Sequence, residues 1–431
     1  MTKYLRTICT LISIITIPLS AGAQLTLDEC QKLAQENYPL LKKYELIRQT
    51  TSYSIKNINK GYLPQLSFTG QATYQSDVAT LPDALSNMLE SSGYDYKGLN
   101  KDQYKISMDL NQVIWDGGNL KAQKKVTTLQ GEVQIVQTDV DMYAIRDRVN
   151  NLFFGILLIE DKIRLNEDLQ RLLSSNCQKL ESMLANGTAM QADVDVVRAE
   201  LLNTQQQMTE LLSTKESYQK ILSIFIGKDE TAVSTLQKPS SIMPATLDNF
   251  RPELKLFNTQ LQQANAQKKL LNAGLRPKIS LFAQGGYGYP GYDMFNDMFD
   301  HDWTLNGMIG IRLTWNISNL YTHKNEKRKI DLSRRQIETN RDIFLFNNSL
   351  LSTQEEASIW KYRKMITEDK EIIGLRTSVR QAAEAKLEHG IIDVNNLLQE
   401  ITRENHARIE QSSHEIEMLK NIYELKNTIN Q

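Results

Sequence analysis

The sequence predicts a mostly α-helical protein with a small antiparallel β part, in which a strand pair followed by a long helical hairpin occurs twice. Three observations carry this prediction. Residues 119–225 contain no proline, and their apolar residues recur at helical spacing. Four shorter segments alternate apolar and polar residues with the period of a β-strand. The same landmarks then recur in the second half of the chain, in the same order.

The N-terminal residues have the composition of a secretory signal peptide. Lys3 and Arg6 supply a positive start, residues 8–19 are mostly apolar, and Ala21-Gly22-Ala23 places small residues at a cleavage site. We therefore predict a signal peptide over 1–23 and an exported chain. A short buried helix is the alternative. No later run reaches the roughly 18 apolar residues of a membrane-spanning helix.

Net charge and cysteine usage exclude some classes of protein. The formal net charge is −1, and loss of Lys3 and Arg6 with the leader makes it −1 − 2 = −3. Without a basic excess, nucleic acid is not an expected partner. Cys30 does not follow the small residues of a lipoprotein cleavage site, so no lipid anchor is expected. Cys30 and Cys177 lie on different predicted helices, and we expect both to be free.

The first repeat begins with a helix that runs from Thr26 towards Lys60 and breaks near Pro39. Strands are expected at about 65–76 and 104–115, with a polar loop over 77–102 between them. One long helix then starts at 119 and turns near Gly187, because glycine suits the left-handed position after a helix end. The returning helix carries a coiled-coil seam of three- and four-residue steps. The seam consists of Val194, Val197, Leu201, Thr204, Met208, Leu211, Lys215, Tyr218, Leu222 and Phe225.

The second repeat shows the same order after an irregular connection. Strands are expected at about 278–289 and 305–315, and a second proline-free helical stretch turns at Gly390. The offsets between matching landmarks are similar: 213 from Pro39 to Pro252, 213 from Pro64 to Pro277, 200 from Trp115 to Trp315 and 203 from Gly187 to Gly390. We therefore predict an internal duplication, with repeat 1 at about 24–226, a connector at about 227–250 and repeat 2 at about 251–431.

The four strands have the features of outer-membrane barrel strands. Each has one apolar and one polar face, and aromatic residues mark the ends. A soluble antiparallel sheet with one wet face has the same period and is the alternative. Because a sheet in lipid must close, and a closed barrel needs at least about eight strands, four strands per chain imply an oligomer with a wet lumen. The residues expected at the membrane interfaces are Tyr62, Trp115, Trp303 and Trp315.

Three segments carry a family resemblance. The strand pair that ends in Trp115-Asp-Gly-Gly, the helix start at Arg251-Pro-Glu-Leu, and Gly187 followed by Asp193-Val194 resemble the TolC-type outer-membrane efflux factors. The resemblance covers nearly the whole mature chain. It implies a homotrimer with a 12-stranded barrel in the outer membrane, continued by an α-helical barrel in the periplasm. It further implies a passive exit duct that docks by its helical tips to a periplasmic adaptor and an inner-membrane transporter.

The same resemblance locates the gate at the helical turns. Some family members bind cations through carboxylates six and nine residues after the second turn glycine. Asn396 and Gln399 occupy those positions here, and Asp393 lies at a different helical angle, so we expect a less negative constriction. The residues assigned to the gate and docking tips are Gly187, Asp193, Gly390, Asp393, Asn396 and Gln399.

Patterns that suggest an enzyme do not hold together. Gly286, Gly288 and Gly291 match G-x-G-x-x-G, but Pro290 and the following loop do not supply the helix that holds a pyrophosphate. Glu410 and His414 lack further ligands, and we interpret them as a solvated helix surface. We therefore predict no catalytic, cofactor-binding or metal residue, and no cofactor.

Three questions stay open at the level of sequence. A basic cluster after each strand pair is either an ordinary charged helix surface or an anion-attracting collar. The function alternative to a channel is an exported coiled-coil scaffold whose strands form a soluble sheet. The transported substrate and the class of pump are not encoded in this chain. The basic residues are Lys121, Lys124, Lys125, Lys324, Lys327, Arg328, Lys329, Arg334 and Arg335.

Overall fold

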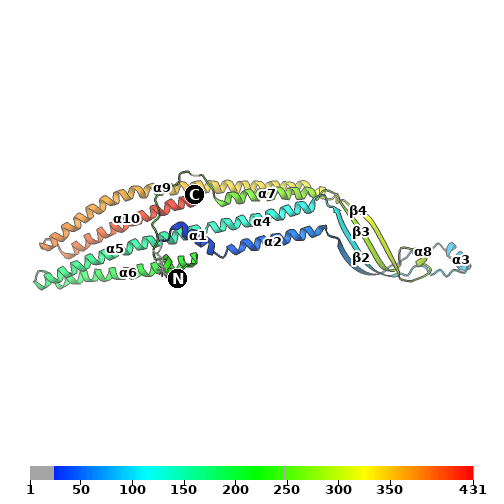
Figure 1. Ribbon diagram of the computed structural model, residues 1–431, viewed down its shortest axis with the longest axis horizontal. Helices are drawn as coiled ribbons and strands as arrows, with labels where there is room; N and C mark the ends of the chain where they lie inside the picture. The colour runs from blue at the N-terminus through cyan, green and yellow to red at the C-terminus, as the bar shows by residue number, and fades with distance from the viewer. Residues whose placement is uncertain (1–23, 247, 431) are drawn as a thin grey trace, which may run out of the picture. The chain divides into compact units, whose positions relative to one another are not determined.

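A computed structural model describes residues 24–246 and 248–430, so the predicted signal peptide lies outside the described residues. The chain divides into two compact units. Unit 1 takes the described parts of Met1–Pro39, Ala144–Asn249 and Ser349–Gln431, and unit 2 takes Leu40–Tyr143 and Phe250–Asn348. Figure 1 shows the helices and strands that make up each unit.

Unit 2 contains an antiparallel four-stranded sheet in the order β1-β2-β3-β4. The strands are β1 (Gln65–Tyr74), β2 (Asp102–Trp115), β3 (Lys278–Tyr289) and β4 (Thr304–Thr314). Leu66 pairs with Leu110, Leu110 with Ala283, and Ala283 with Ile309. This register places most apolar residues of the four strands on one face and most polar residues on the other, with Phe282 and Met308 on the polar face. The predicted strands and their alternation are confirmed.

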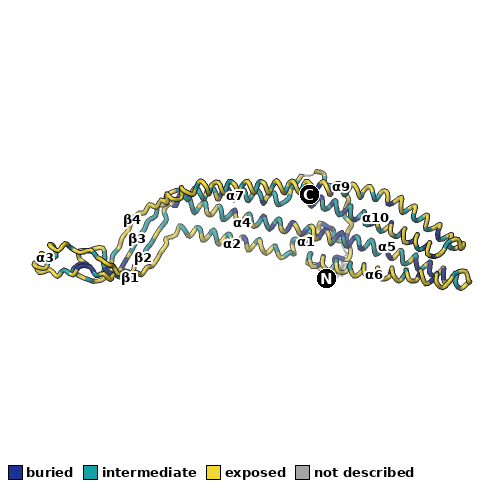
Figure 2. The backbone as a smooth tube through the Cα atoms, turned by 180° about the vertical axis from the view of Figure 1, so that it is seen from behind, coloured by how far each residue is buried: buried dark blue, intermediate teal, exposed yellow. Residues whose placement is uncertain are grey.

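The apolar face of the sheet is exposed. Phe68, Ile309 and Ile311 are 71%, 73% and 72% exposed, and Figure 2 shows the strands mainly in the colours of exposed and intermediate residues. Strands β1 and β4 each pair with one neighbour only, so both edges of the sheet are open in the described chain. Unit 2 therefore presents a lipophilic surface and two unpaired strand edges.

The helices of unit 2 lie at one end of the sheet, and its outer loops lie at the other (Figure 1). Helix α4 (Asn119–Tyr143) packs against both α2 (Leu41–Asn59) and α7 (Pro252–Ala273). Gly131 permits close approach to α2, since a Cβ there would lie 2.4 Å from Thr51 Oγ1. A 2.9 Å ion pair joins Lys268 of α7 to Asp331, which lies on α9 (Asn319–Glu388).

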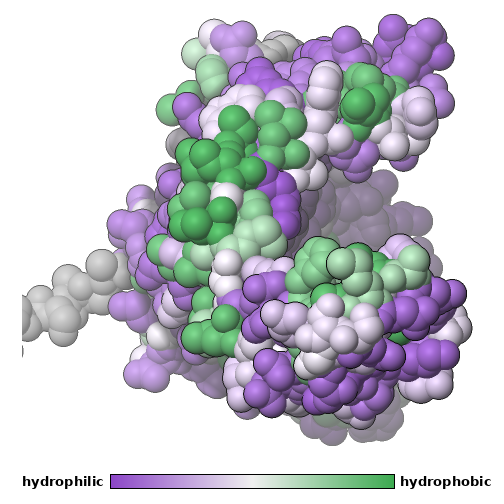
Figure 3. Space-filling view, turned by 90° about the vertical axis from the view of Figure 1, so that its right-hand side faces the viewer, coloured by the Kyte–Doolittle hydropathy of each residue, from purple (hydrophilic) through white to green (hydrophobic). Residues whose placement is uncertain are grey.

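The outer loops contain two short helices, α3 (Asp83–Ser91) and α8 (Met294–Asp297). The predicted polar loop over 77–102 therefore contains a helix that the sequence did not predict. Pro82 precedes the first helical residue and Asp83 places a carboxylate in the first turn, both of which favour a helix start. Figure 3 looks onto this end of unit 2, where patches of hydrophobic side chains interrupt a hydrophilic surface.

Unit 1 consists mainly of long helices. They are α1 (Leu27–Asn37), α5 (Ile145–Ala185), α6 (Gln191–Ile226), α10 (Val394–Ile429) and the part of α9 from Ser349 onwards. Thr26 and Glu29 form a capping box at the start of α1, and the helix ends before Pro39 as predicted. The predicted single helix from 119 is two helices, because Ala144 separates α4 from α5. Leu25 makes a parallel bridge with Leu236 in the segment after α6.

The predicted seam of α6 is confirmed, including its polar positions. Val194, Val197 and Leu222 are buried, and their seam neighbours are partly or fully buried. Thr204 is tolerated because its hydroxyl donates a hydrogen bond to the Glu200 carbonyl at 2.8 Å. Lys215 is tolerated because its ammonium lies 3.0 Å from the Glu160 carboxylate of α5.

The two described cysteines are free, as predicted. Both are buried, and burial raises the pKa of the Cys30 thiol to about 12. Neither thiol is therefore ionised at neutral pH, and neither contributes a reactive group to the surface.

Gly288 of β3 provides a test of the β2–β3 pairing. A Cβ at this position would lie 2.3 Å from the Tyr104 carbonyl oxygen, so Gly288→Ala should destabilise the protein by about 1–3 kcal/mol. Gly285→Ala is the matched control, since nothing lies within 4 Å of its Cβ position. Denaturant midpoints of the purified variants measure the difference. Equal midpoints for the two variants would show that the close approach does not constrain the sheet.

Candidate functional site: the turns of the helical hairpins

The two hairpin turns of unit 1 have the same backbone geometry. Gly187 has φ +73° and Gly390 has φ +69°. In the first turn, Gly187 N–H donates to Leu184 O at 2.9 Å and Thr188 N–H donates to Met183 O at 2.9 Å. Gly390 and Ile391 repeat this pattern in the second turn, at 2.9 and 2.8 Å. This is the Schellman motif, in which a left-handed glycine terminates the helix.

The carboxylates after the turns cap the helices that follow. Asp193 accepts a hydrogen bond from the Met190 N–H at 2.9 Å, three residues before it. Asp393 instead lies at the N-cap of α10 and accepts from the Asn396 N–H at 2.8 Å and from Asn396 Nδ2 at 2.9 Å. Each carboxylate thus compensates unpaired N–H groups of a helix start.

The two turns differ in the residue that follows the glycine by six positions. Asp193 stands there in the first turn and Asn396 in the second. Asn396, Gln399 and Asp393 are all exposed. The second turn therefore presents one carboxylate and two neutral amides, whereas a carboxylate occupies the Asn396 position in the first turn.

One apolar cluster underlies both turns. It takes residues from α5, α6, α9 and α10, all within unit 1. Because a core of this kind is close-packed, the two hairpins cannot move apart here without exposing it to water. The cluster consists of Leu173, Cys177, Leu180, Val194, Val197, Ala383, Val394, Leu397 and Ile401.

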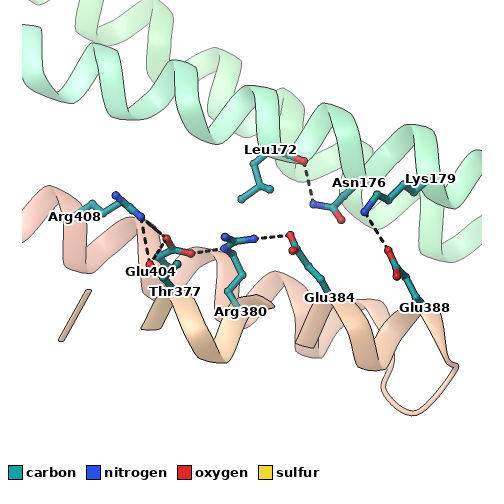
Figure 4. Close-up of polar contacts among 9 residues, drawn as sticks. All are labelled: Leu172, Asn176, Lys179, Thr377, Arg380, Glu384, Glu388, Glu404 and Arg408. Atoms are coloured by element: carbon teal, nitrogen blue, oxygen red, sulfur yellow. Dashed lines mark hydrogen bonds and ion pairs between the residues drawn. The ribbon is translucent and has the colours of Figure 1, made fainter. Parts of the chain in front are cut away.

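A charged clasp joins α9 to α10 behind the second turn (Figure 4). Glu404 of α10 is only 5% exposed, and it accepts hydrogen bonds from Arg380 and Thr377 of α9 and from Arg408. Arg380 also contacts Glu384 at 2.6 Å. Arg380, Glu404 and Arg408 border a cavity of about 240 Å³ that Leu172 of α5 also lines.

The clasp favours the charged form of Glu404. Burial by itself would raise the pKa of this carboxyl group. The hydrogen bonds from Arg408, Thr377 and Arg380 outweigh that effect, so the pKa is lowered. The folded state is therefore stabilised by the ionised carboxylate at neutral pH.

Other ion pairs near the turns are exposed. Lys179 of α5 lies 3.1 Å from Glu388 of α9 (Figure 4), and Arg198 of α6 lies 3.1 Å from Glu181 of α5. All four side chains are about half exposed, so each pair contributes at most about 1 kcal/mol. The first of these pairs links the two hairpins directly.

The predicted interface aromatics lie at the two ends of the sheet in unit 2. Tyr62, Trp115 and Trp315 are at the end that carries the helices, and Trp315 Nε1 donates to Leu275 O at 2.9 Å. Trp303 is at the loop end, where it stacks on Tyr104 with ring centroids 6.3 Å apart. All four predicted residues are between 42% and 53% exposed.

The residues of the two enzyme-like sequence patterns lie in different elements of the fold. Gly286 and Gly288 lie within β3, and α8 is only four residues long. The solvated-surface interpretation holds for Glu410, which is exposed, but is wrong for His414, because His414 Nδ1 lies 2.7 Å from Asp369 Oδ2 in a partly buried pair. Periodicity along one helix could not reveal this partner on α9. Across residues 24–246 and 248–430, no group of three or more potential metal ligands comes together.

No helix in the described part of the chain is long and apolar enough to cross a membrane.

The clasp residues were not singled out by the sequence analysis. The pairs Arg380–Glu384 and Glu404–Arg408 have i,i+4 spacing, which is a visible signal of helix-surface ion pairs. That spacing is too common to identify a functional cluster. The contact between Arg380 and Glu404 crosses from one helix to the other, so only the tertiary structure reveals it.

Glu404→Gln should lower the free energy of unfolding by about 1–3 kcal/mol at pH 7, because charge-assisted hydrogen bonds from two arginines are lost. The pKa of Glu404 is lowered on folding, so its contribution is present above the ordinary glutamate pKa of about 4.3 and is lost as pH falls through the lowered value. The acid-induced loss of stability should therefore be smaller in the variant than in the parent.

Denaturant titrations at several pH values measure this difference. They run from about pH 3 to about pH 7, a range that includes the pKa of roughly 4.3 of a free glutamate. The control is Glu410→Gln, which removes an exposed partner of His406 and should cost under about 1 kcal/mol. If Glu404→Gln and Glu410→Gln lower the free energy of unfolding equally at each pH, the clasp does not stabilise the folded state.

Comparison with known proteins shows what the chain is similar to. The family model of the outer membrane efflux proteins matches residues 31–221. A search of curated proteins yields no match. The chain is similar to the solved outer-membrane channel OprN, with TM-score 0.67 and 12% identity over 94% of this chain and 89% of that chain.

Two further solved structures share the fold. The outer membrane protein VceC from Vibrio cholerae matches with TM-score 0.67 and 12% identity, over 94% of this chain and 95% of that chain. The CmeC outer membrane channel from Campylobacter jejuni matches with TM-score 0.65 and 13% identity, over 94% of this chain and 85% of that chain. The resemblance seen in the sequence is confirmed: the outer membrane efflux protein model matches residues 31–221, and the solved outer-membrane channels share the fold of the chain.

Proposed function

We propose that this protein is a passive exit duct of the outer membrane, assembled as a homotrimer. The observation that carries the proposal is the sheet of unit 2, which combines one exposed apolar face, one polar face and two open edges. An apolar face of this extent is unfavourable in water and suits contact with lipid. The family supports an outer-membrane location and a role in efflux.

Closure of the sheet requires copies of the chain. In lipid, the unpaired backbone N–H and C=O groups of β1 and β4 would each cost roughly several kcal/mol. Pairing β4 of one copy with β1 of the next satisfies both edges. Three copies give 3 × 4 = 12 strands, within the range of closed membrane barrels. The polar face then surrounds a water-filled lumen.

The aromatic residues fit the two surfaces of a bilayer. Trp115 and Tyr104 lie on the same strand, 115 − 104 = 11 residues apart. At about 3.3 Å per residue and a strand tilt of about 40°, this separation spans roughly 28 Å across the membrane. Trp303 extends the outer band through its stacking on Tyr104.

The helical hairpins are proposed to continue the duct into the periplasm as an α-helical barrel. Their turns, with Gly187 and Asp193 in the first and Gly390, Asp393 and Asn396 in the second, would form the gate and the docking surface. The partners would be a periplasmic adaptor and an inner-membrane transporter that supplies the energy. The matching Schellman turns support an equivalent role for the two hairpins.

An exported coiled-coil scaffold is the alternative, since the same helices could form a soluble assembly. Outer-membrane fractions run on unheated and heated gels distinguish the two. A detergent-dependent trimer that converts to monomer on heating supports the duct. A periplasmic protein that stays soluble without detergent would contradict it.

The gate should bind divalent cations weakly. The second turn carries neutral Asn396 and Gln399 at exposed positions, and the Asp393 carboxylate is engaged by Asn396. Divalent cations added from the periplasmic side should therefore block single-channel conductance weakly in the parent. Asn396→Asp combined with Gln399→Glu should lower the half-blocking concentration several-fold, because three copies would add six carboxylates (3 × 2) near one axis.

Gln206→Glu combined with Gln207→Glu is the matched control for this experiment. Both glutamines are exposed on α6 and lie about four turns beyond the start of that helix. The control adds the same charge away from the turn and should leave block unchanged. Strong block of the parent channel would refute the neutral gate.

A further inference from the structure

The second outer loop, residues 290–303, reaches over the polar face of the sheet. Tyr292 N–H donates to Asn306 Oδ1 at 2.9 Å, and its hydroxyl donates to Gln284 Oε1 at 3.3 Å. Both partners belong to the polar face, because the register pairs Gly286 with Asn306 and Asp109 with Gln284. The phenol ring is thus held against the polar strands.

Buried contacts fix the shape of this loop. Asp297 is 3% exposed, and its carboxylate accepts a hydrogen bond from the Gly291 N–H at 2.7 Å. The Tyr289 hydroxyl donates to the Asp297 carbonyl at 3.1 Å. His301 contacts Gly98 O at 2.7 Å, which ties this loop to the first outer loop. These contacts hold the loop in one conformation and thereby fix the position of Tyr292.

Lys105 lies beside the Tyr292 ring. Its ammonium is 5.6 Å from the ring centroid, and its side chain crosses β3 at Gly286, where a Cβ would lie 3.1 Å from Lys105 Cε. The next charged residue along the same face of β2 is Asp109, which is engaged by Gln284 Nε2 at 2.6 Å. The outer end of the polar face therefore carries a positive charge next to an aromatic ring.

A cavity of about 340 Å³ adjoins this pair, and its other polar side chains are neutral. They offer amide and hydroxyl groups, which bind solutes of either charge. Lys105 is thus the only charged side chain among the described residues that line the cavity. The neutral polar residues are Gln71, Thr73, Gln75, Gln103, Tyr104, Tyr289, Tyr292 and Asn306.

We propose that Tyr292 and Lys105 form a neck inside the outer end of the lumen, which narrows the passage and favours anionic over cationic solutes. The proposal rests on the proposed function, since only a closed barrel makes the polar face a lumen. Three copies bring three rings and three ammonium groups to one level. Rings narrow the opening, and the charges raise the local concentration of anions.

Cysteine labelling from outside the cell tests the narrowing. Ser67 lies opposite Asp109 on the inner side of the neck, and Thr73 lies opposite Gln103 on its outer side. Ser67→Cys and Thr73→Cys are each placed in a chain whose Cys30 and Cys177 are replaced by alanine. Intact cells are then treated with a small maleimide and with a large polyethylene glycol maleimide.

The large reagent should label T73C readily and S67C slowly, whereas the small one should label both. Adding Tyr292→Ala should raise labelling of S67C by the large reagent to the rate seen at T73C. Phe295→Ala is the matched control, because it removes an aromatic ring of the same loop that is 67% exposed. The neck does not exist if the large reagent labels S67C as fast as T73C in the parent. It also does not exist if Tyr292→Ala leaves the rate at which the large reagent labels S67C unchanged.

Charged thiosulfonates test the role of Lys105. In the S67C chain, Lys105→Gln should lower the ratio of anionic to cationic labelling several-fold. Lys101→Gln is the control, since the Lys101 ammonium is bound to the Ser76 carbonyl at 3.0 Å. An unchanged ratio in Lys105→Gln would overturn the charge preference. If no trimer forms and labelling at both sites is independent of Tyr292, the proposed duct fails as well as the neck.

Discussion

The pairing of β2 with β3 is the contact on which the rest of unit 2 depends. It joins Leu110 to Ala283, two residues separated by 173 positions in the chain, and so brings the two strand pairs into one sheet. A slip by one residue would move every apolar side chain of one pair to the polar face. Gly288 permits this register, since the Tyr104 backbone occupies the space where a Cβ would lie. The exposed apolar face, the polar face and the position of Tyr292 over Lys105 all follow from it.

Unit 1 consists mainly of long helices, which are held together along a narrow seam. Its polar positions are compensated individually, as the hydrogen bond from the Thr204 hydroxyl to the Glu200 carbonyl and the Lys215–Glu160 ion pair show. Near the turns, an apolar cluster joins the two hairpins, and Glu404 joins α9 to α10. Removal of one partner from a buried ion cluster of this kind leaves an uncompensated charge, which is strongly destabilising. The turns are therefore supported by both apolar packing and directed charge contacts.

The two turns share a backbone motif but differ in charge. Both end a helix with a left-handed glycine, and both use an aspartate to cap the next helix. Asp193 caps from within its helix, whereas Asp393 caps from the position before α10. That shift leaves Asn396 where the first turn has a carboxylate. The chemical asymmetry of the proposed gate thus comes from a change in capping position and not from a change in the turn.

The sequence by itself determined the strands, the hairpin turns and the coiled-coil seam, because periodicity and glycine conformation are local properties that neighbouring residues reveal. The dependence on local patterns also explains which features the sequence did not predict. The helix α3 was missed within a polar segment, and the one-residue interruption at Ala144 left no compositional mark. Only the tertiary structure decided which faces meet. The Asp369–His414 pair, the clasp at Glu404 and the placement of Tyr292 beside Lys105 join residues on different elements, and such contacts depend on register and packing that one-dimensional spacing does not specify.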